Sequence, residues 1–92
     1  MDKGIEVLFS GMVQGVGFRF TARHLAGKYK IKGSVMNLSD GRVKLLAEGP
    51  QENLNNFLGD LKEEFKRYLT GFELQEKEPC RAYKDFQIKF SI

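Results

Sequence analysis

The sequence predicts an α+β fold in which strands and helices follow one another in the order β-α-β-β-α-β. Three observations support this prediction. Apolar and polar residues alternate near both ends of the chain, two segments carry apolar residues at helical spacing, and glycine or proline separates these segments. Because the chain has only 92 residues, we expect a single small domain that spans residues 1–92.

The first strand is predicted over residues 4–11, where Ile5, Val7 and Phe9 alternate with other residues. A helix over residues 18–30 follows, because the apolar spacing changes there to that of an amphipathic helix. The apolar face of this helix consists of Phe18, Ala22, Leu25, Ala26 and Tyr29.

A hairpin comes next, with strands at residues 34–38 and 42–48 joined by a tight turn at residues 39–41. Pro50 then suits the first turn of a helix, because its missing N–H would have no partner there. We expect this second helix over residues 51–67. Its apolar stripe consists of Leu54, Phe57, Leu58, Leu61 and Phe65.

Two further segments alternate, weakly at residues 72–76 and strongly at residues 86–90, so the fourth strand is expected to be split or doubled. This order of elements is the ferredoxin-like, split βαβ plan, an antiparallel sheet with two helices on one face. Four aromatic residues are expected in the core: Phe57, Phe65, Phe86 and Phe90.

The composition excludes several classes of protein. One cysteine and one histidine can form neither a disulfide framework nor a typical zinc site, so we expect no metal. The sequence has no secretory signal and no run of about 20 apolar residues, so we expect a cytoplasmic protein without a membrane partner. The net charge of +3 is unevenly distributed, because residues 13–45 hold seven basic groups and one acidic group. Such a field attracts a small anion.

Three glycines, Gly11, Gly15 and Gly17, lie close together between the first strand and the first helix. A glycine-lined turn at a helix N-terminus can direct successive N–H groups at one point and so form a cradle for an anion. The alternative is a turn that merely needs positive φ angles. Arg19 favours a phosphate site, because its planar, permanently charged fork can bind two oxygens of a phosphate.

The segments 11–19, 37–43 and 47–50 closely resemble the acylphosphatase family. This resemblance implies a small α/β sandwich that hydrolyses the carboxyl–phosphate bond of acyl phosphates, with no metal and no cofactor. By the same resemblance, Arg19 matches the phosphate-binding arginine and Asn37 matches the residue that orients the attacking water. The residues whose backbone amides match the cradle are Gln14, Gly15, Val16, Gly17, Phe18 and Arg19.

The chemistry of an acyl phosphate agrees with these residues. Its leaving carboxylate has a pKa of about 4 to 5 and can depart without a proton from the protein. The remaining tasks are to spread charge over the phosphoryl oxygens and to hold a water molecule in line. Backbone N–H groups, a guanidinium and one amide suit these tasks. His24 and Cys80 are expected to have no catalytic role.

Two other functions remain open. RNA-recognition domains share the βαββαβ order, and residues 15–20 faintly resemble one of their signatures, but that signature belongs on the third strand and not at the end of the first. A non-catalytic binding or maturation module of the same fold is the second alternative. The presence of both Arg19 and Asn37 favours the enzyme, so we expect a monomer that acts on a small-molecule acyl phosphate, without nucleic acid.

Overall fold

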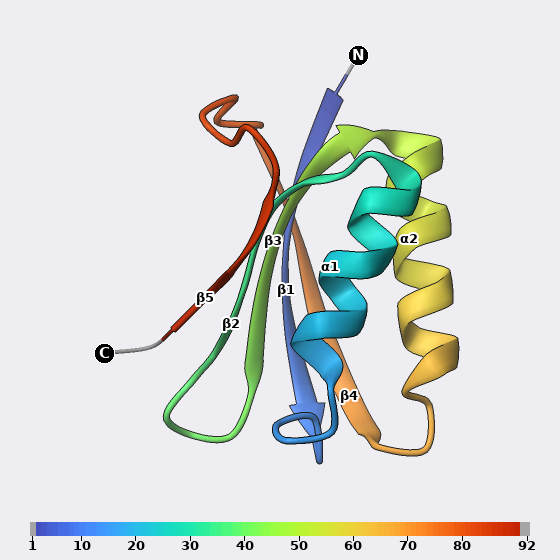
Figure 1. Ribbon diagram of the computed structural model, residues 1–92, viewed down its shortest axis with the longest axis vertical. Coiled ribbons are helices and arrows are strands. Elements are labelled where there is room, and N and C mark those ends of the chain that lie inside the picture. Colours follow the sequence, from blue (N-terminus) through green and yellow to red (C-terminus); the bar gives the residue numbers. More distant parts are fainter. Residues whose placement is uncertain (1, 91–92) are drawn as a thin grey trace.

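Two helices cover one face of a five-stranded sheet (Figure 1). The computed structural model describes residues 2–90. Its elements are β1 (Asp2–Gly11), α1 (Phe18–Tyr29), β2 (Lys32–Asn37), β3 (Val43–Pro50), α2 (Gln51–Glu64), β4 (Leu69–Lys77) and β5 (Phe86–Lys89). The order and the layers confirm the predicted fold class, with the fourth strand doubled into β4 and β5.

The sheet has the strand order β4-β1-β3-β2-β5, and its last pair differs from the expected antiparallel arrangement. Three pairs are antiparallel, whereas β2 and β5 are parallel, so the sheet is mixed. The reason lies in the course of residues 78–85. β4 ends beside the start of β1, where Lys77 pairs with Gly4, and Phe86 then pairs with Gly33 near the start of β2. Because the chain crosses that end of the sheet, β5 runs in the direction of β2.

The crossing segment is attached to the sheet by Glu48, near the end of β3. Its carboxylate accepts hydrogen bonds from the backbone N–H groups of Cys80, at 2.7 Å, and Arg81, at 3.1 Å. Two backbone donors on one carboxylate fix the path of a segment that has no regular structure of its own. Cys80 itself is exposed.

The core lies between the sheet and the helices. Ile5, Val7 and Phe9 are buried, as their alternation predicted. Three of the four aromatic residues that were expected in the core are buried there: Phe57, Phe65 and Phe86. The prediction for Phe90 is wrong, because its side chain is 76% exposed. The pairing of β5 ends at Lys89, so Phe90 lies beyond the sheet although the sequence pattern continues through it.

Both helices end earlier than predicted. α1 ends at Tyr29, because Lys30 adopts a left-handed conformation with φ 57° and ψ 44°. The N–H of Lys30 then bonds to the carbonyl of Gly27, and the N–H of Ile31 bonds to that of Ala26, which is the Schellman arrangement. α2 ends at Glu64, not at residue 67, and a turn leads into β4.

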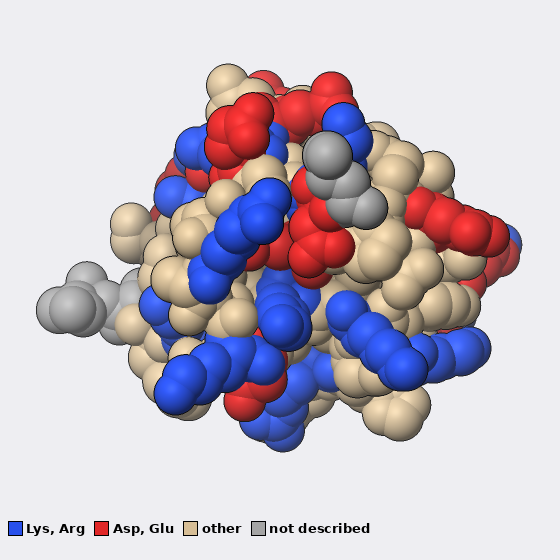
Figure 2. All heavy atoms as spheres, turned by 90° about the horizontal axis from the view of Figure 1, so that it is seen from above, with Lys and Arg blue, Asp and Glu red and all other residues tan. Residues whose placement is uncertain are grey.

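Charge is unevenly distributed at the end of the molecule where α1 ends and α2 begins. Figure 2 looks onto this end and shows most Lys and Arg side chains over one half of the face and most Asp and Glu side chains over the other half. No helix within residues 2–90 is both long enough and apolar enough to cross a membrane.

Candidate phosphate-binding site

The loop between β1 and α1 owes its shape to two glycines. Gly15 has φ 79° and Gly17 has φ 81°, in the left-handed region that other residues adopt at a cost. A Cβ atom at either position would meet no other atom within 4 Å, so backbone conformation and not crowding explains the glycines. The turn therefore does need positive φ angles, which was the alternative reason for its glycines. The same angles direct the backbone into α1.

The N-terminus of α1 is open. Gly17 caps the helix without a side-chain hydrogen bond, and the first turn has no acidic residue. The first helical bond runs from the N–H of Thr21 to the carbonyl of Gly17, at 3.0 Å. Within the described chain, the N–H groups of Phe18, Arg19 and Phe20 have no acceptor. These donors and the positive end of the helix dipole can receive an anion.

Arg19 lies in this first turn and is partly exposed. Its guanidinium carbon lies 5.4 Å from the centre of the Phe90 ring, a cation–π contact. No carboxylate among residues 2–90 pairs with Arg19. Within residues 2–90 its hydrogen-bond donors thus have no carboxylate partner, while the aromatic ring covers part of the cation.

Asn37 is the last residue of β2 and pairs with Val43, the first residue of β3. Its Oδ1 atom is buried, and no group within residues 2–90 donates a hydrogen bond to it. A buried acceptor without a partner costs about 1 to 3 kcal/mol of folding free energy. The amide oxygen is thus an unsatisfied acceptor, and it has almost no contact with solvent.

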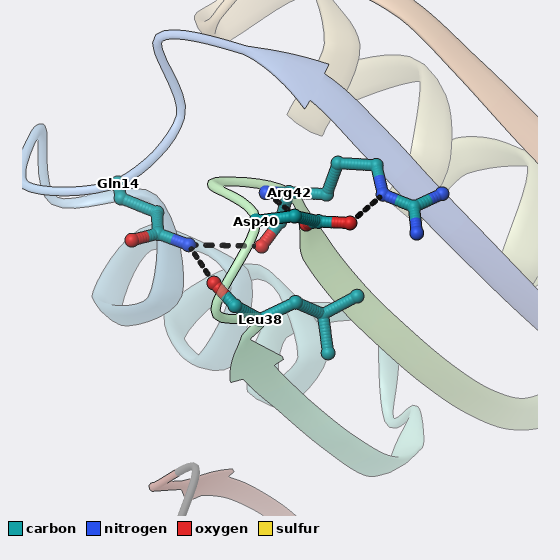
Figure 3. A network of polar contacts seen from close by, with 4 residues as sticks. All are labelled: Gln14, Leu38, Asp40 and Arg42. Carbon is teal, nitrogen blue, oxygen red and sulfur yellow. Dashed lines mark hydrogen bonds and ion pairs between the residues drawn. The ribbon is translucent and has the colours of Figure 1, made fainter.

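Gln14 joins the glycine loop to the turn that follows Asn37 (Figure 3). Its Nε2 donates to the carbonyl oxygens of Leu38, at 2.7 Å, and Arg42, at 3.0 Å. Only the backbone amide of Gln14 was predicted from the sequence to take part in the site. The role of its side chain was missed, since nothing in the sequence indicates a partner more than 20 residues away.

The turn that Gln14 contacts is itself closed by Asp40 and Arg42. The Asp40 carboxylate accepts the backbone N–H of Arg42 at 3.0 Å and its Nε–H at 2.9 Å. These donors, the backbone N–H above all, lower the pKa of Asp40 below its ordinary value. Because Leu38 N–H also bonds to the Arg42 carbonyl, at 2.8 Å, the acceptors of Gln14 have fixed positions.

The remaining predicted residues fall into two groups. Phe18 is buried and Val16 packs against the core, so only their backbones can face a ligand in the loop. His24 is exposed on α1, and Cys80 lies on the crossing segment far along the chain. Neither contacts the loop through any hydrogen bond or ion pair of the described residues.

A βαββαβ order with an open helix N-terminus after the first strand defines a ferredoxin-like domain with a candidate anion site. Residues 5–88 match the family model described as acylphosphatase, and the chain belongs to the acylphosphatase family. The chain is 37% identical over 87 residues to an acylphosphatase of Bacillus velezensis. The aligned residues cover 92% of this chain and 96% of that protein. The family resemblance and the expectation of an acylphosphatase enzyme are confirmed.

Solved structures agree with this assignment. The crystal structure of acylphosphatase from Bacillus subtilis superposes with a TM-score of 0.85 at 33% identity, over 97% of this chain and 99% of that chain. Full-length HypF is similar over 97% of this chain but only 12% of its own length, with a TM-score of 0.83 and 30% identity. The same domain therefore also occurs as a small part of a larger protein.

Proposed function

We propose that this enzyme hydrolyses the carboxyl–phosphate bond of acyl phosphates by direct attack of water on a phosphoryl group bound in the β1–α1 loop. The buried, unpaired Oδ1 of Asn37 carries the proposal. Once a small rotation of the amide brings it to the surface, this atom would supply a hydrogen-bond acceptor for water beside a turn that Gln14 fixes to the loop. The proposed reaction uses no metal, no cofactor and no covalent intermediate on the protein.

The phosphoryl group would be held by the backbone N–H groups from Gln14 to Arg19 and by the Arg19 guanidinium. These groups are fixed by the glycine backbone and by the helix, so they need little reorganisation when charge spreads over the phosphoryl oxygens. Arg19 can bind two oxygens at once through its planar fork.

Asn37 would orient the attacking water, since its carbonyl oxygen accepts a hydrogen bond from water and its amide donates to a phosphoryl oxygen. A bond forms between the water oxygen and phosphorus, and the bond from phosphorus to the acyl oxygen breaks. The carboxylate leaves with the electron pair of that bond, and the water proton passes to a phosphate oxygen. The low pKa of the leaving carboxylic acid makes an acid from the protein unnecessary.

The substrate would be a small-molecule acyl phosphate, recognised mainly through its phosphate. We propose that the chain acts on it as a monomer and without nucleic acid. Of the two aromatic residues within residues 15–20, Phe18 is buried and cannot stack on a base, and only Phe20 is exposed, whereas RNA-recognition domains stack two or three bases on exposed aromatic residues of the sheet.

The test is hydrolysis of benzoyl phosphate and acetyl phosphate, with and without a chelator, by wild type and by Asn37→Ala and Arg19→Ala. We expect turnover that the chelator does not change. Asn37→Ala should abolish turnover and keep the inhibition by inorganic phosphate, whereas Arg19→Ala should lose that inhibition and about 10³-fold or more in rate.

Asn56→Ala, an exposed residue on α2, is the matched control and should behave as wild type. Equal loss of phosphate inhibition in Asn37→Ala and Arg19→Ala would contradict the division of roles. Absence of turnover together with tight binding of single-stranded RNA would overturn the proposal.

A further inference from the structure

A second cationic site lies toward the C-terminal end of α1, away from the glycine loop. It is a cavity of about 330 Å³ bounded by α1, the start of β2 and the residues that precede β5. We call it the basic groove. Four cations line it, namely Arg23, Lys30, Lys32 and Lys84. Ala26, Ile31 and Phe86 also line it but are almost fully buried, and Asp85 is its one acidic residue.

The basic groove collects the cations of residues 13–45 that lie outside the glycine loop and form no ion pair within residues 2–90. Of the seven basic residues there, Arg19 lies at the glycine loop. Three others form ion pairs: Lys28–Asp60 at 3.8 Å, Arg42–Asp40 at 2.9 Å and Lys44–Glu6 at 3.8 Å. The remaining three are Arg23, Lys30 and Lys32, and all of them line the groove.

None of the four cations of the groove has an ion pair with any carboxylate of residues 2–90. Like charges around one small cavity repel one another, and an anion in the cavity would relieve that repulsion. The groove has four cations and one carboxylate, and the binding of an anion would explain this excess of positive charge.

The backbone of Lys30 gives a separate indication. Lys30 occupies the left-handed position that ends α1, where glycine is strongly preferred because a side chain there is strained. A strained non-glycine residue points to a functional requirement for its side chain. Here that side chain carries a charge and lines the basic groove.

Gly27 shows the opposite pattern. It lies inside α1, where glycine is less favourable than alanine, and its φ angle is not positive. A Cβ at this position would meet nothing within 4 Å, so neither crowding nor backbone conformation requires glycine. Since Gly27 also lines the groove, the absence of a side chain keeps the cavity open.

The size and surroundings of the groove restrict what it can bind. A volume near 330 Å³ is at the small end of ligand pockets, which run from about 300 to 1,000 Å³. Acidic side chains gather over one half of the end where α1 ends (Figure 2), so a long polyanion that extended from the groove onto that half would be repelled. A small anion with a compact organic part fits both the cations and the volume.

We propose that the basic groove binds a small organic phosphate of about the size of a nucleoside monophosphate. The doubly charged phosphate would lie among Lys30, Lys32 and Lys84, and the organic part would lie against the exposed Gly27 and the aliphatic part of the Arg23 side chain. This site is distinct from the glycine loop, and the proposal does not depend on the proposed hydrolysis.

The test is a titration of the ¹⁵N-labelled full chain with adenosine monophosphate at low salt, followed through backbone amide shifts. We expect saturable shifts at residues 26–33 and 84–86. Gly27→Glu places a carboxylate in the groove, and Lys30→Gln removes one cation. We expect the dissociation constant for adenosine monophosphate to rise about tenfold or more in Gly27→Glu and about threefold in Lys30→Gln. Neither variant should change the turnover of acetyl phosphate.

Gly59→Glu is the matched control for Gly27→Glu. Gly59 also lies inside a helix with nothing within 4 Å of an added Cβ, and the substitution changes the net charge equally, but it lies on α2 outside the groove. Binding should persist in Gly59→Glu. Equal weakening in both glycine variants, or no saturable shift at the groove residues in wild type, would overturn the proposal. Tighter binding of an RNA oligonucleotide than of adenosine monophosphate at these residues would also overturn it. Shifts confined to residues 15–19 would assign the ligand to the glycine loop alone.

Discussion

The side-chain Nε2 of Gln14 lies 2.7 Å from the carbonyl oxygen of Leu38, the residue that follows Asn37. Through this bond a side chain of the β1–α1 loop holds the end of β2 in place. The loop carries the backbone donors and leads to Arg19, and the end of β2 carries the amide. A single glutamine therefore sets the spacing between the two parts of the candidate site.

We expect Gln14→Met to lower kcat by about 10- to 100-fold while the fold persists, because misplaced catalytic groups lose rate more readily than stability. The carbonyls of Leu38 and Arg42 each keep one backbone donor, so thermal stability should fall only slightly. The measurements are kcat, KM and the melting temperature. Gln51→Met is the matched control, since its amide bonds only to the exposed Asn55. An unchanged kcat in Gln14→Met would show that the contact has no positioning role.

Phe90 contacts the guanidinium of Arg19, so we expect Phe90→Ala to weaken phosphate binding by about two- to fivefold. Its side chain is exposed, and the melting temperature should therefore stay close to that of wild type. The measurement is the inhibition constant of inorganic phosphate. Phe20→Ala is the control, because Phe20 makes the same kind of contact with Arg23. If both variants lost phosphate affinity equally, the contact with Arg19 would not be the cause.

The pH dependence of stability should reveal Glu48. Burial disfavours its charge, but hydrogen bonds from the side chain and backbone of Cys80, together with the N–H and the charge of Arg81, outweigh burial and lower the pKa of Glu48 below its ordinary value of 4.5. A carboxyl group whose pKa is lowered by folding stabilises the folded state at pH values above its pKa in the unfolded state. This contribution is lost as the pH falls through the pKa of the folded state.

We therefore expect Glu48→Gln to destabilise the protein by about 1 kcal/mol at pH 7 and to flatten the loss of stability on acidification. Urea unfolding between neutral pH and pH 3 measures both effects. Glu73→Gln on the edge strand β4 is the control and should follow wild type. A difference between Glu48→Gln and wild type that grew as the pH fell would contradict the assignment.

Lys30→Gly should raise the free energy of unfolding by about 1 kcal/mol, since glycine adopts the left-handed conformation without strain. The measurement is the midpoint of thermal or urea unfolding. Lys32→Gly, within β2, should instead destabilise the protein, because glycine weakens a strand. If Lys30→Gly were less stable than wild type, the lysine side chain would stabilise the fold. Backbone strain at Lys30 would then no longer indicate a function for its side chain in the basic groove.

The strands and helices that face the core were predictable because burial imposes a periodicity on their sequences. Ile5, Val7 and Phe9 alternate because one face of β1 is buried, and Ala22 and Ala26 recur one turn apart for the same reason. β4 was harder to predict. It is an edge strand, and Phe72 and Leu74 stay substantially exposed, so no strong alternation marks its true start at Leu69.

The loop of the candidate site was predictable from its glycines and from Arg19, because few other local requirements gather those residues. The hydrogen bonds of the Gln14 side chain and the contact between Arg19 and Phe90 were not predictable. Both join segments that are distant along the chain, and neither leaves a periodic trace in the sequence. The direction of β5 was also hidden, since it depends on which edge residues 78–85 reach.

The place of β1 within the sheet affects how the chain folds. β1 is the first strand in sequence, yet it lies between β3 and β4, where Ile5 pairs with Ala47 on one side and Glu76 on the other. During synthesis it has no partner until β3 has been made, and its second neighbour, β4, ends 27 residues after β3, which takes about 1 to 5 seconds at about 5 to 20 residues per second. The apolar residues of β1 therefore wait without their native cover, and this interval is when the nascent chain is most exposed to aggregation.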